Sequence, residues 1–163
     1  RKLKMIQKEK EVRELAGILK TVDSCDTCRL GLVDGNKAYI VPLCFGYTFL
    51  NGKFTFYFQS MLDEKKTALI KAAEEAAEEI TFQMDANHCM LPVGGSEYTM
   101  LYSSAFGCGR PVFLNGEEEK RTALKHILAH YIPGKFAEDQ GSLPENACIF
   151  KLEVTELTCR ENR

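Results

Sequence analysis

The sequence lacks the features that mark two broad classes of protein. No stretch of the 163 residues approaches the roughly 20 consecutive apolar residues that a membrane-spanning helix requires. The charges nearly balance, with 21 Lys and Arg against 23 Asp and Glu and a formal net charge of −2, whereas binding to a nucleic-acid backbone requires a basic surface. The basic segment 1–10 is not followed by the apolar run of a secretory signal. We therefore expect a soluble protein with neither a membrane nor a nucleic-acid partner.

Histidine is also scarce, with three copies in the chain. His126 and His130 are four residues apart on a predicted helix, as metal ligands can be, but no glutamate stands between them to act as a general base. They lie away from the apolar stripe of that helix, so we expect both to be solvated. His88 has no clear partner in the sequence. We predict no metal site.

Cysteine, by contrast, is plentiful, and its count is odd. The seven are Cys25, Cys28, Cys44, Cys89, Cys108, Cys148 and Cys159. Several fall in apolar, strand-like runs, where a free cysteine packs as a small hydrophobic residue. Cys25 and Cys28 have CxxC spacing, but the pair leads into a strand and lacks a second ligand pair, so we expect neither a redox nor a zinc site. Reduced thiols predict a cytoplasmic protein.

The hydrophobic pattern predicts a mainly β domain that spans the whole chain, 1–163, without repeats or linkers. About six strands and three helices are expected, with most strands joined by tight turns, which favours an antiparallel barrel with helices packed outside it. The predicted helices cover residues 7–20, 63–77 and 117–131, and the predicted strands include 28–33, 37–47, 79–85, 98–114 and 147–157. Residues 132–146 are predicted to form a loop.

Local signals sharpen this prediction. Asn51-Gly52 is typical of a type I′ hairpin turn, since both positions require positive φ. In the strand that follows, Phe54, Phe56 and Phe58 alternate with polar residues and Tyr57 and so share one face. The glycines at 107 and 109 suggest a bend or bulge in a long strand.

Pro42 is out of place in a strand whose pattern indicates a central, buried position, because proline cannot donate to a strand ladder. A bulge there would leave backbone groups around Leu43 and Cys44 free for a ligand, and a simple bend is the alternative. Farther along, segment 58–66 (FQSMLDEKK) ends a strand and begins a helix with a hydroxyl and two lysines. Helix starts present unpaired N–H groups and partial positive charge, so they bind phosphate. A solvated helix start is the alternative reading here.

A third segment, 98–109 (YTMLYSSAFGCG), combines hydroxyl and aromatic side chains with two glycines that allow a ligand to approach the backbone. Taken in order, residues 28–34, 41–47, 58–66, 98–109 and 118–131 resemble successive blocks of one known family. It is the FMN-binding split barrels related to pyridoxamine 5′-phosphate oxidase, in the nitroimidazole-resistance (Nim-like) branch.

The resemblance implies a homodimer with the flavin, FMN or alternatively FAD, in a groove at the subunit interface. It places the isoalloxazine ring along Pro42, Leu43, Cys44 and Phe45. It places the ribityl-phosphate end at Gln59, Ser60, Lys65 and Lys66. Tyr102 and Ser104 would complete the site. This agrees with the physical needs of a flavin, an apolar slot for the ring and cationic donors for the phosphate.

The resemblance implies an FMN-dependent oxidoreductase that passes electrons from a nicotinamide donor to a small acceptor. Gln59 stands where the family usually has histidine, and glutamine cannot shuttle a proton near neutral pH; Glu64 replaces a common glycine. A flavin-binding module without dedicated catalysis is therefore an alternative, and a haem-binding split barrel is another. No catalytic residue is assigned.

Overall fold

A computed structural model describes residues 2–132, 134 and 145–163 of the chain. In this part of the chain there are nine strands, more than the six expected, and three helices. The elements are β1 (Lys4–Met5), β2 (Glu9–Val12), α1 (Leu15–Ser24), β3 (Cys28–Asp34), β4 (Lys37–Leu43), β5 (Gly46–Leu50), β6 (Lys53–Met61), α2 (Lys65–Glu75), β7 (Ile80–Gly94), β8 (Glu97–Phe113), α3 (Glu117–Tyr131) and β9 (Ala147–Asn162). The loop predicted at 132–146 lies largely outside the described residues.

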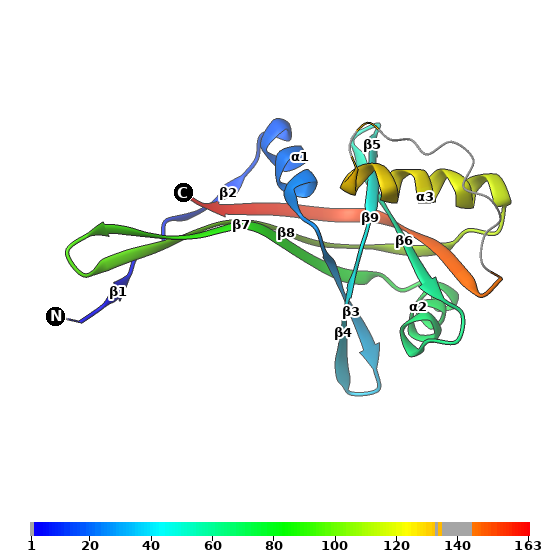
Figure 1. Ribbon diagram of the computed structural model, residues 1–163. Helices are drawn as coiled ribbons and strands as arrows, with labels where there is room; N and C mark the ends of the chain where they lie inside the picture. Colours follow the sequence, from blue (N-terminus) through cyan, green and yellow to red (C-terminus); the bar gives the residue numbers. More distant parts are fainter. Residues whose placement is uncertain (1, 133, 135–144) are drawn as a thin grey trace.

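All strands belong to one sheet whose two ends are joined by a very short link. The strand order is β4-β3-β7-β8-β9-β6-β5 with antiparallel neighbours, while β2 pairs with β9 and β1 pairs in parallel with β8. Only Cys44 and Phe45 separate β4 from β5 in the chain. Three chain steps reach at most about 11 Å, whereas seven flat strands would hold the ends about 29 Å apart. The sheet therefore curls into a barrel, and the helices lie outside its strands (Figure 1).

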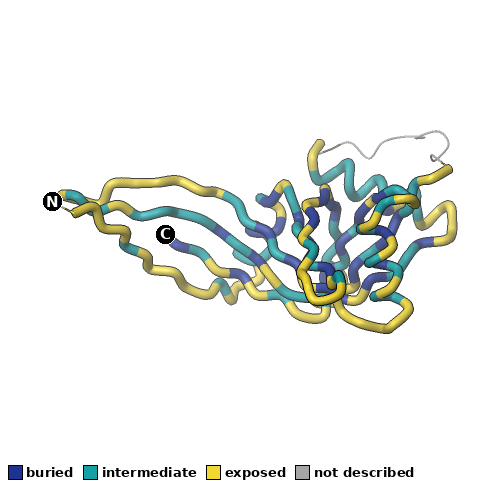
Figure 2. Tube along the Cα trace, turned by 90° about the horizontal axis from the view of Figure 1, so that it is seen from below, coloured by how far each residue is buried: buried dark blue, intermediate teal, exposed yellow. Residues whose placement is uncertain are grey.

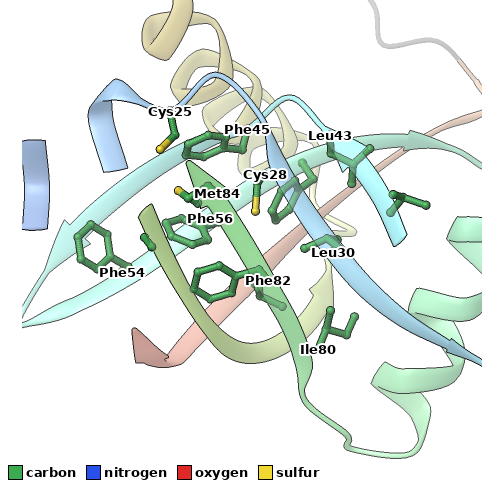
Figure 3. Packing of buried hydrophobic residues seen from close by; sticks show 14 of the residues in the cluster. Cys25, Cys28, Leu30, Leu43, Phe45, Phe54, Phe56, Ile80, Phe82 and Met84 are labelled. Carbon is green, nitrogen blue, oxygen red and sulfur yellow. The ribbon is translucent and has the colours of Figure 1, made fainter. Parts of the chain in front are cut away.

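Phenylalanine rings are prominent in the core of the barrel. Phe54, Phe56 and Phe58 are buried and alternate along β6 with more exposed residues, which confirms the predicted pattern. The Phe56 ring meets the Phe82 ring of β7 edge-on, with 5.1 Å between centroids, and the Phe45 ring at 5.6 Å. Edge-to-face contacts are favoured because the positive ring edge meets the negative ring face. Figure 3 shows how these rings from three parts of the chain converge.

The hairpin signals are confirmed, but the first helix is not where it was predicted. Asn51 and Gly52 have φ values of 52° and 76° at the turn between β5 and β6. Helix α1 begins at Leu15 rather than near residue 7, because residues 9–12 form β2 and pair with residues 159–162 of β9. A strand partner some 150 positions away along the chain leaves no trace in the local periodicity, which indicated a helix.

β7 and β8 continue well beyond the barrel as a projecting hairpin arm, defined here as residues 87–102. Every residue of the arm is exposed or only partly buried, whereas buried positions are concentrated in the barrel (Figure 2). Apolar side chains lie exposed along it, among them Met90, Leu91, Val93 and Tyr98. The sequence predicted a strand of only 79–85 here, since the outer part of β7 lacks the inward-facing apolar alternation of a barrel strand.

None of the helices in the described residues is long and apolar enough to cross a bilayer. The same residues contain no cluster of three or more histidine, cysteine or acidic side chains placed to hold a metal ion.

The register of β8 and β9 shifts at Cys108/Gly109, which confirms the bulge suggested by the glycines. At Gly107 an added Cβ would lie 1.8 Å from the carbonyl oxygen of Glu156, whereas at Gly31 the nearest atom would be the Thr81 oxygen at 3.7 Å.

We therefore expect Gly107→Ala to lower the free energy of unfolding by about 3 kcal/mol, since backbone rather than a flexible side chain must move. The matched substitution Gly31→Ala should stay within about 1 kcal/mol of the parent, because only ordinary contacts form and a strand glycine is lost. Urea unfolding of the two variants tests this, and equal costs would contradict it.

Candidate functional site

Pro42 lies on an edge strand, not on the central buried strand that the sequence indicated. Among the described residues β4 ends the strand order and pairs with β3 alone, and Arg29 faces Pro42 without any break in register. Neither the bulge nor the bend is therefore needed, because an edge strand has one side on which no donor is required. Val41 and Leu43 are buried in the core, while Pro42 and Cys44 are exposed on the outside. This leaves an outward-facing, partly apolar edge.

The predicted strand 37–47 is interrupted at Cys44-Phe45, and the end of α3 holds the interruption in place. The Phe45 N–H donates to the Tyr131 hydroxyl at 3.0 Å, and that hydroxyl donates to the Asp26 carbonyl at 2.6 Å. Phe45 thus finds its hydrogen-bond acceptor on a helix instead of on a neighbouring strand. The ring-binding segment expected from the sequence is also the segment that closes the barrel.

The two helical histidines are packed rather than solvated, which corrects the sequence prediction. The His130 side chain is 1% exposed, with Nε2 2.6 Å from the Cys25 carbonyl oxygen and its ring 4.4 Å from the Phe45 ring. The His126 ring stacks on Tyr57 at 5.4 Å, and burial lowers its pKa.

The signal that the sequence offered for this packing was Gly46. A Cβ there would lie 2.3 Å from the backbone of His126, so the helix can rest directly on the strand only at a glycine. His130 Nδ1 has no hydrogen-bond partner among the described residues and lies 3.9 Å from an Asp23 carboxylate oxygen. Nε2 donates to the Cys25 carbonyl, because a carbonyl oxygen can only accept.

The residues predicted to hold a phosphate lie at the start of α2, but they differ in their availability. Gln59 is exposed at the end of β6. Ser60 is 3% exposed and its hydroxyl is hydrogen-bonded to that of Thr67 at 2.9 Å, so it supports the helix start from within. Lys65 and Lys66 are the first two residues of the helix, and no acceptor for their backbone N–H groups lies among the described residues.

Tyr102 and Ser104 lie on β8, three strand positions away from β4. Ser104 stands opposite Asp85 of β7 and Arg160 of β9. At about 4.8 Å per strand, the distance between β4 and β8 within one chain is about 14 Å. The structure therefore brings the lysines near the β3–β4 hairpin, through Lys65 and Asp34 at 2.6 Å, but leaves Tyr102 and Ser104 apart from both.

Three polar side chains that the sequence analysis did not single out lie on β3 and β7, the strands between β4 and β8. Arg29 of β3 lies 3.5 Å from the Asp85 carboxylate and 3.4 Å from the Gln83 side-chain oxygen, and Gln83 donates to Asp85 at 2.7 Å. Gln83 and Asp85 share one face of β7, but Arg29 becomes their neighbour only through the pairing of β3 with β7, which no sequence spacing could have revealed.

The sequence profile of the pyridoxamine 5′-phosphate oxidase family matches residues 14–161, nearly the whole of the chain. The chain belongs to this family. The resemblance seen in the sequence blocks is thereby confirmed, and the curled antiparallel sheet is the family's split barrel. No curated protein is similar enough to the chain to count as a match.

Solved structures agree with this assignment at the level of the fold. A candidate 5-nitroimidazole antibiotic resistance protein from Bacteroides thetaiotaomicron is 24% identical, with a TM-score of 0.77 over 96% of this chain and 89% of its own. An FAD-binding protein from Mesorhizobium loti is 18% identical, with a TM-score of 0.64 over 94% and 97% of the two chains. An FAD and haem binding protein from Mycobacterium smegmatis is 17% identical, with a TM-score of 0.67 over 96% and 74%.

The CxxC pair is structural, as expected. Cys25 and Cys28 are fully buried, and all seven cysteines are free. Burial raises the pKa of the Cys25 thiol from its ordinary 9.0 to about 12 and raises the pKa of Cys28 as well. Cys44 and Cys89, by contrast, are exposed.

Because the thiolate is the reactive form, we expect iodoacetamide at pH 8 to label Cys44 and Cys89 and to spare Cys25 and Cys28 until the protein unfolds. Peptide mass spectrometry reads this directly, and early labelling of Cys25 would contradict it.

The raised pKa values also predict that the contribution of the buried thiols to the free energy of unfolding is fully present below pH 9. It is lost as the pH rises towards 12, since the thiols of the unfolded chain ionise first.

Proposed function

We propose that this protein binds a flavin nucleotide, with the ring along Pro42, Leu43, Cys44 and Phe45 and the phosphate at the start of α2. The observation that carries the proposal is the junction of an exposed edge strand with a helix start that bears two lysines and free N–H groups. β4 has a strand partner on one side only, so its outer side offers backbone donors and acceptors to the polar edge of a ring. The phosphate would meet N–H groups, cations and the helix dipole.

FMN is the cofactor that this arrangement fits first, with FAD as the alternative. Similar folds that bind FAD, and in one case haem as well, support the flavin. A haem is less well served, because His126 and His130 are packed against the barrel and only His88 is an exposed histidine among the described residues. The free cysteines support a reducing, cytoplasmic environment for the protein.

The reaction we propose is electron transfer from a nicotinamide donor through the flavin to a small acceptor. When bound, the flavin supplies the redox chemistry. The chain contributes binding, orientation of the ring against β4 and exclusion of water from one face. Gln59 is exposed where a proton donor would be useful, and its amide cannot give up a proton at neutral pH. This favours as second candidate a flavin-binding module that has no dedicated substrate.

We further propose a homodimer in which the flavin lies at the interface. Two observations support it. The hairpin arm exposes Met90, Leu91 and Val93 without a covering element in the described residues, and exposed apolar patches mark interaction sites. In addition, Ser104 lies about 14 Å from β4 within one chain, which is farther than a single ring contact, so a second copy is the natural source of Tyr102 and Ser104 at each site.

The flavin proposal predicts a protein that takes up FMN and loses it when the lysines are removed. Purified protein offered FMN should show the flavin absorption bands after gel filtration, and Lys65→Ala/Lys66→Ala should release the flavin while keeping the parent unfolding curve. A matched control is Lys20→Ala/Lys53→Ala, which removes two exposed lysines on other elements and should retain the flavin. A parent protein that stays colourless with both FMN and FAD would overturn the proposal.

For the flavin-loaded protein, bleaching of the flavin absorption by NADH with recovery on an added acceptor would separate the enzyme from the binding module.

The dimer proposal predicts that charge on the arm separates the subunits. Sedimentation of the parent should give the mass of two chains, and Leu91→Asp/Val93→Asp should give the mass of one. Leu50→Asp is the control, since Leu50 is also exposed but lies at the far end of β5, away from the arm. A monomeric parent, or an arm variant that stays dimeric, would refute the assignment of the arm to the interface.

A further inference from the structure

Both lysines at the start of α2 already have acidic partners from their own chain. Lys65 Nζ lies 2.6 Å from the Asp34 carboxylate at the tip of the β3–β4 hairpin, and the Tyr39 ring lies beneath it at 5.1 Å from Nζ to the centroid. Lys66 Nζ lies 2.7 Å from the Glu64 carboxylate. The cations that a phosphate requires are therefore engaged by carboxylates at hydrogen-bonding distance.

The pairing of both lysines with carboxylates affects how strongly a phosphate can bind at the start of α2. Asp34 pairs with Lys65 and Glu64 pairs with Lys66, so two carboxylates neutralise the two lysines at this helix start. A phosphate monoester brings about 1.5 to 2 further negative charges at pH 7. It can bind strongly only if it replaces a carboxylate as the partner of a lysine, because repulsion from the remaining acids opposes it.

Asp34 is the carboxylate most able to be replaced. It comes from a different element, the end of β3, so it can leave Lys65 without disturbing the first turn of α2, whereas Glu64 immediately precedes the helix as its N-cap. The hydrogen bond and charge of Asp34 also raise the pKa of Lys65 while the two side chains are paired. The free N–H groups of Lys65 and Lys66 remain as a second set of phosphate donors.

We propose that Asp34 is an internal competitor for the ligand's phosphate, which occupies Lys65 until a phosphate displaces it and thereby sets the affinity for phosphorylated flavins. This rests on the proposed flavin function. The carboxylate subtracts from the affinity for FMN but not from that for riboflavin, which has the same ring and no phosphate. Displacement also frees the tip of the β3–β4 hairpin from α2, so the phosphate, and not the ring, releases that contact.

The test compares FMN and riboflavin on the full chain by quenching of flavin fluorescence. Asp34→Asn removes the charge but keeps a side chain that suits a turn, and it should tighten FMN binding about tenfold at low salt while leaving riboflavin unchanged. The gain should shrink as salt is added, because exposed charges are screened. Glu75→Gln removes one charge at the other end of α2 and should leave both affinities unchanged.

The outcomes separate this inference from the function on which it rests. FMN affinity that is unchanged or weaker in Asp34→Asn would overturn the competitor role while leaving the flavin site standing. An equal gain for riboflavin would also overturn it, because Asp34 would then act on the ring or on the fold. Failure of the parent and the variant to bind either flavin would remove the flavin function itself, and the inference with it.

Discussion

The fold depends on a two-residue link. Cys44 and Phe45 join strands that stand at opposite ends of the sheet order, and so short a connection is possible only if the sheet curls until its two end strands come close together. Closure brings Phe45 against Phe56 and builds the aromatic core. It also draws α3 onto β5, where Gly46 allows the backbones to meet. Barrel, core and helix placement thus follow from one constraint on chain length.

The same link shapes the candidate ligand edge. Because Phe45 N–H bonds to the Tyr131 hydroxyl, the backbone at the end of β4 is held by a helix and its outer side stays unpaired. A rigid edge whose geometry is set in advance suits a planar ring, since less ordering is required on binding. The helix that carries the lysines is held just as firmly from within, through the buried pair Ser60 and Thr67. Both halves of the proposed site are therefore anchored by hydrogen bonds to neighbouring elements.

The proposed site residues fall into two groups that lie apart within one chain. The edge of β4 and the start of α2 are connected within one chain through Asp34 and Lys65, whereas Tyr102 and Ser104 are displaced across β3 and β7. The projecting arm has no buried residue over positions 87–102, whereas burial of apolar surface is the main favourable contribution to folding. A second copy that covers the arm and supplies β8 to the other site would resolve both features together.

The sequence by itself determined the β-rich barrel class, the family, the hairpin turn at Asn51-Gly52 and the inward face of β6. The barrel class, the turn and the strand face follow from local φ requirements and from the period-2 pattern, which neighbouring residues carry, whereas the family follows from the resemblance of the sequence blocks and the profile match over residues 14–161. Only the tertiary structure decided that residues 9–12 are a strand, that Pro42 lies at an edge, that His130 is buried and that Lys65 is paired with Asp34. Each of these depends on a partner far away along the chain, and the physical reason is the same in every case: hydrogen bonds, packing and charge depend on distance in space, which local sequence patterns do not record.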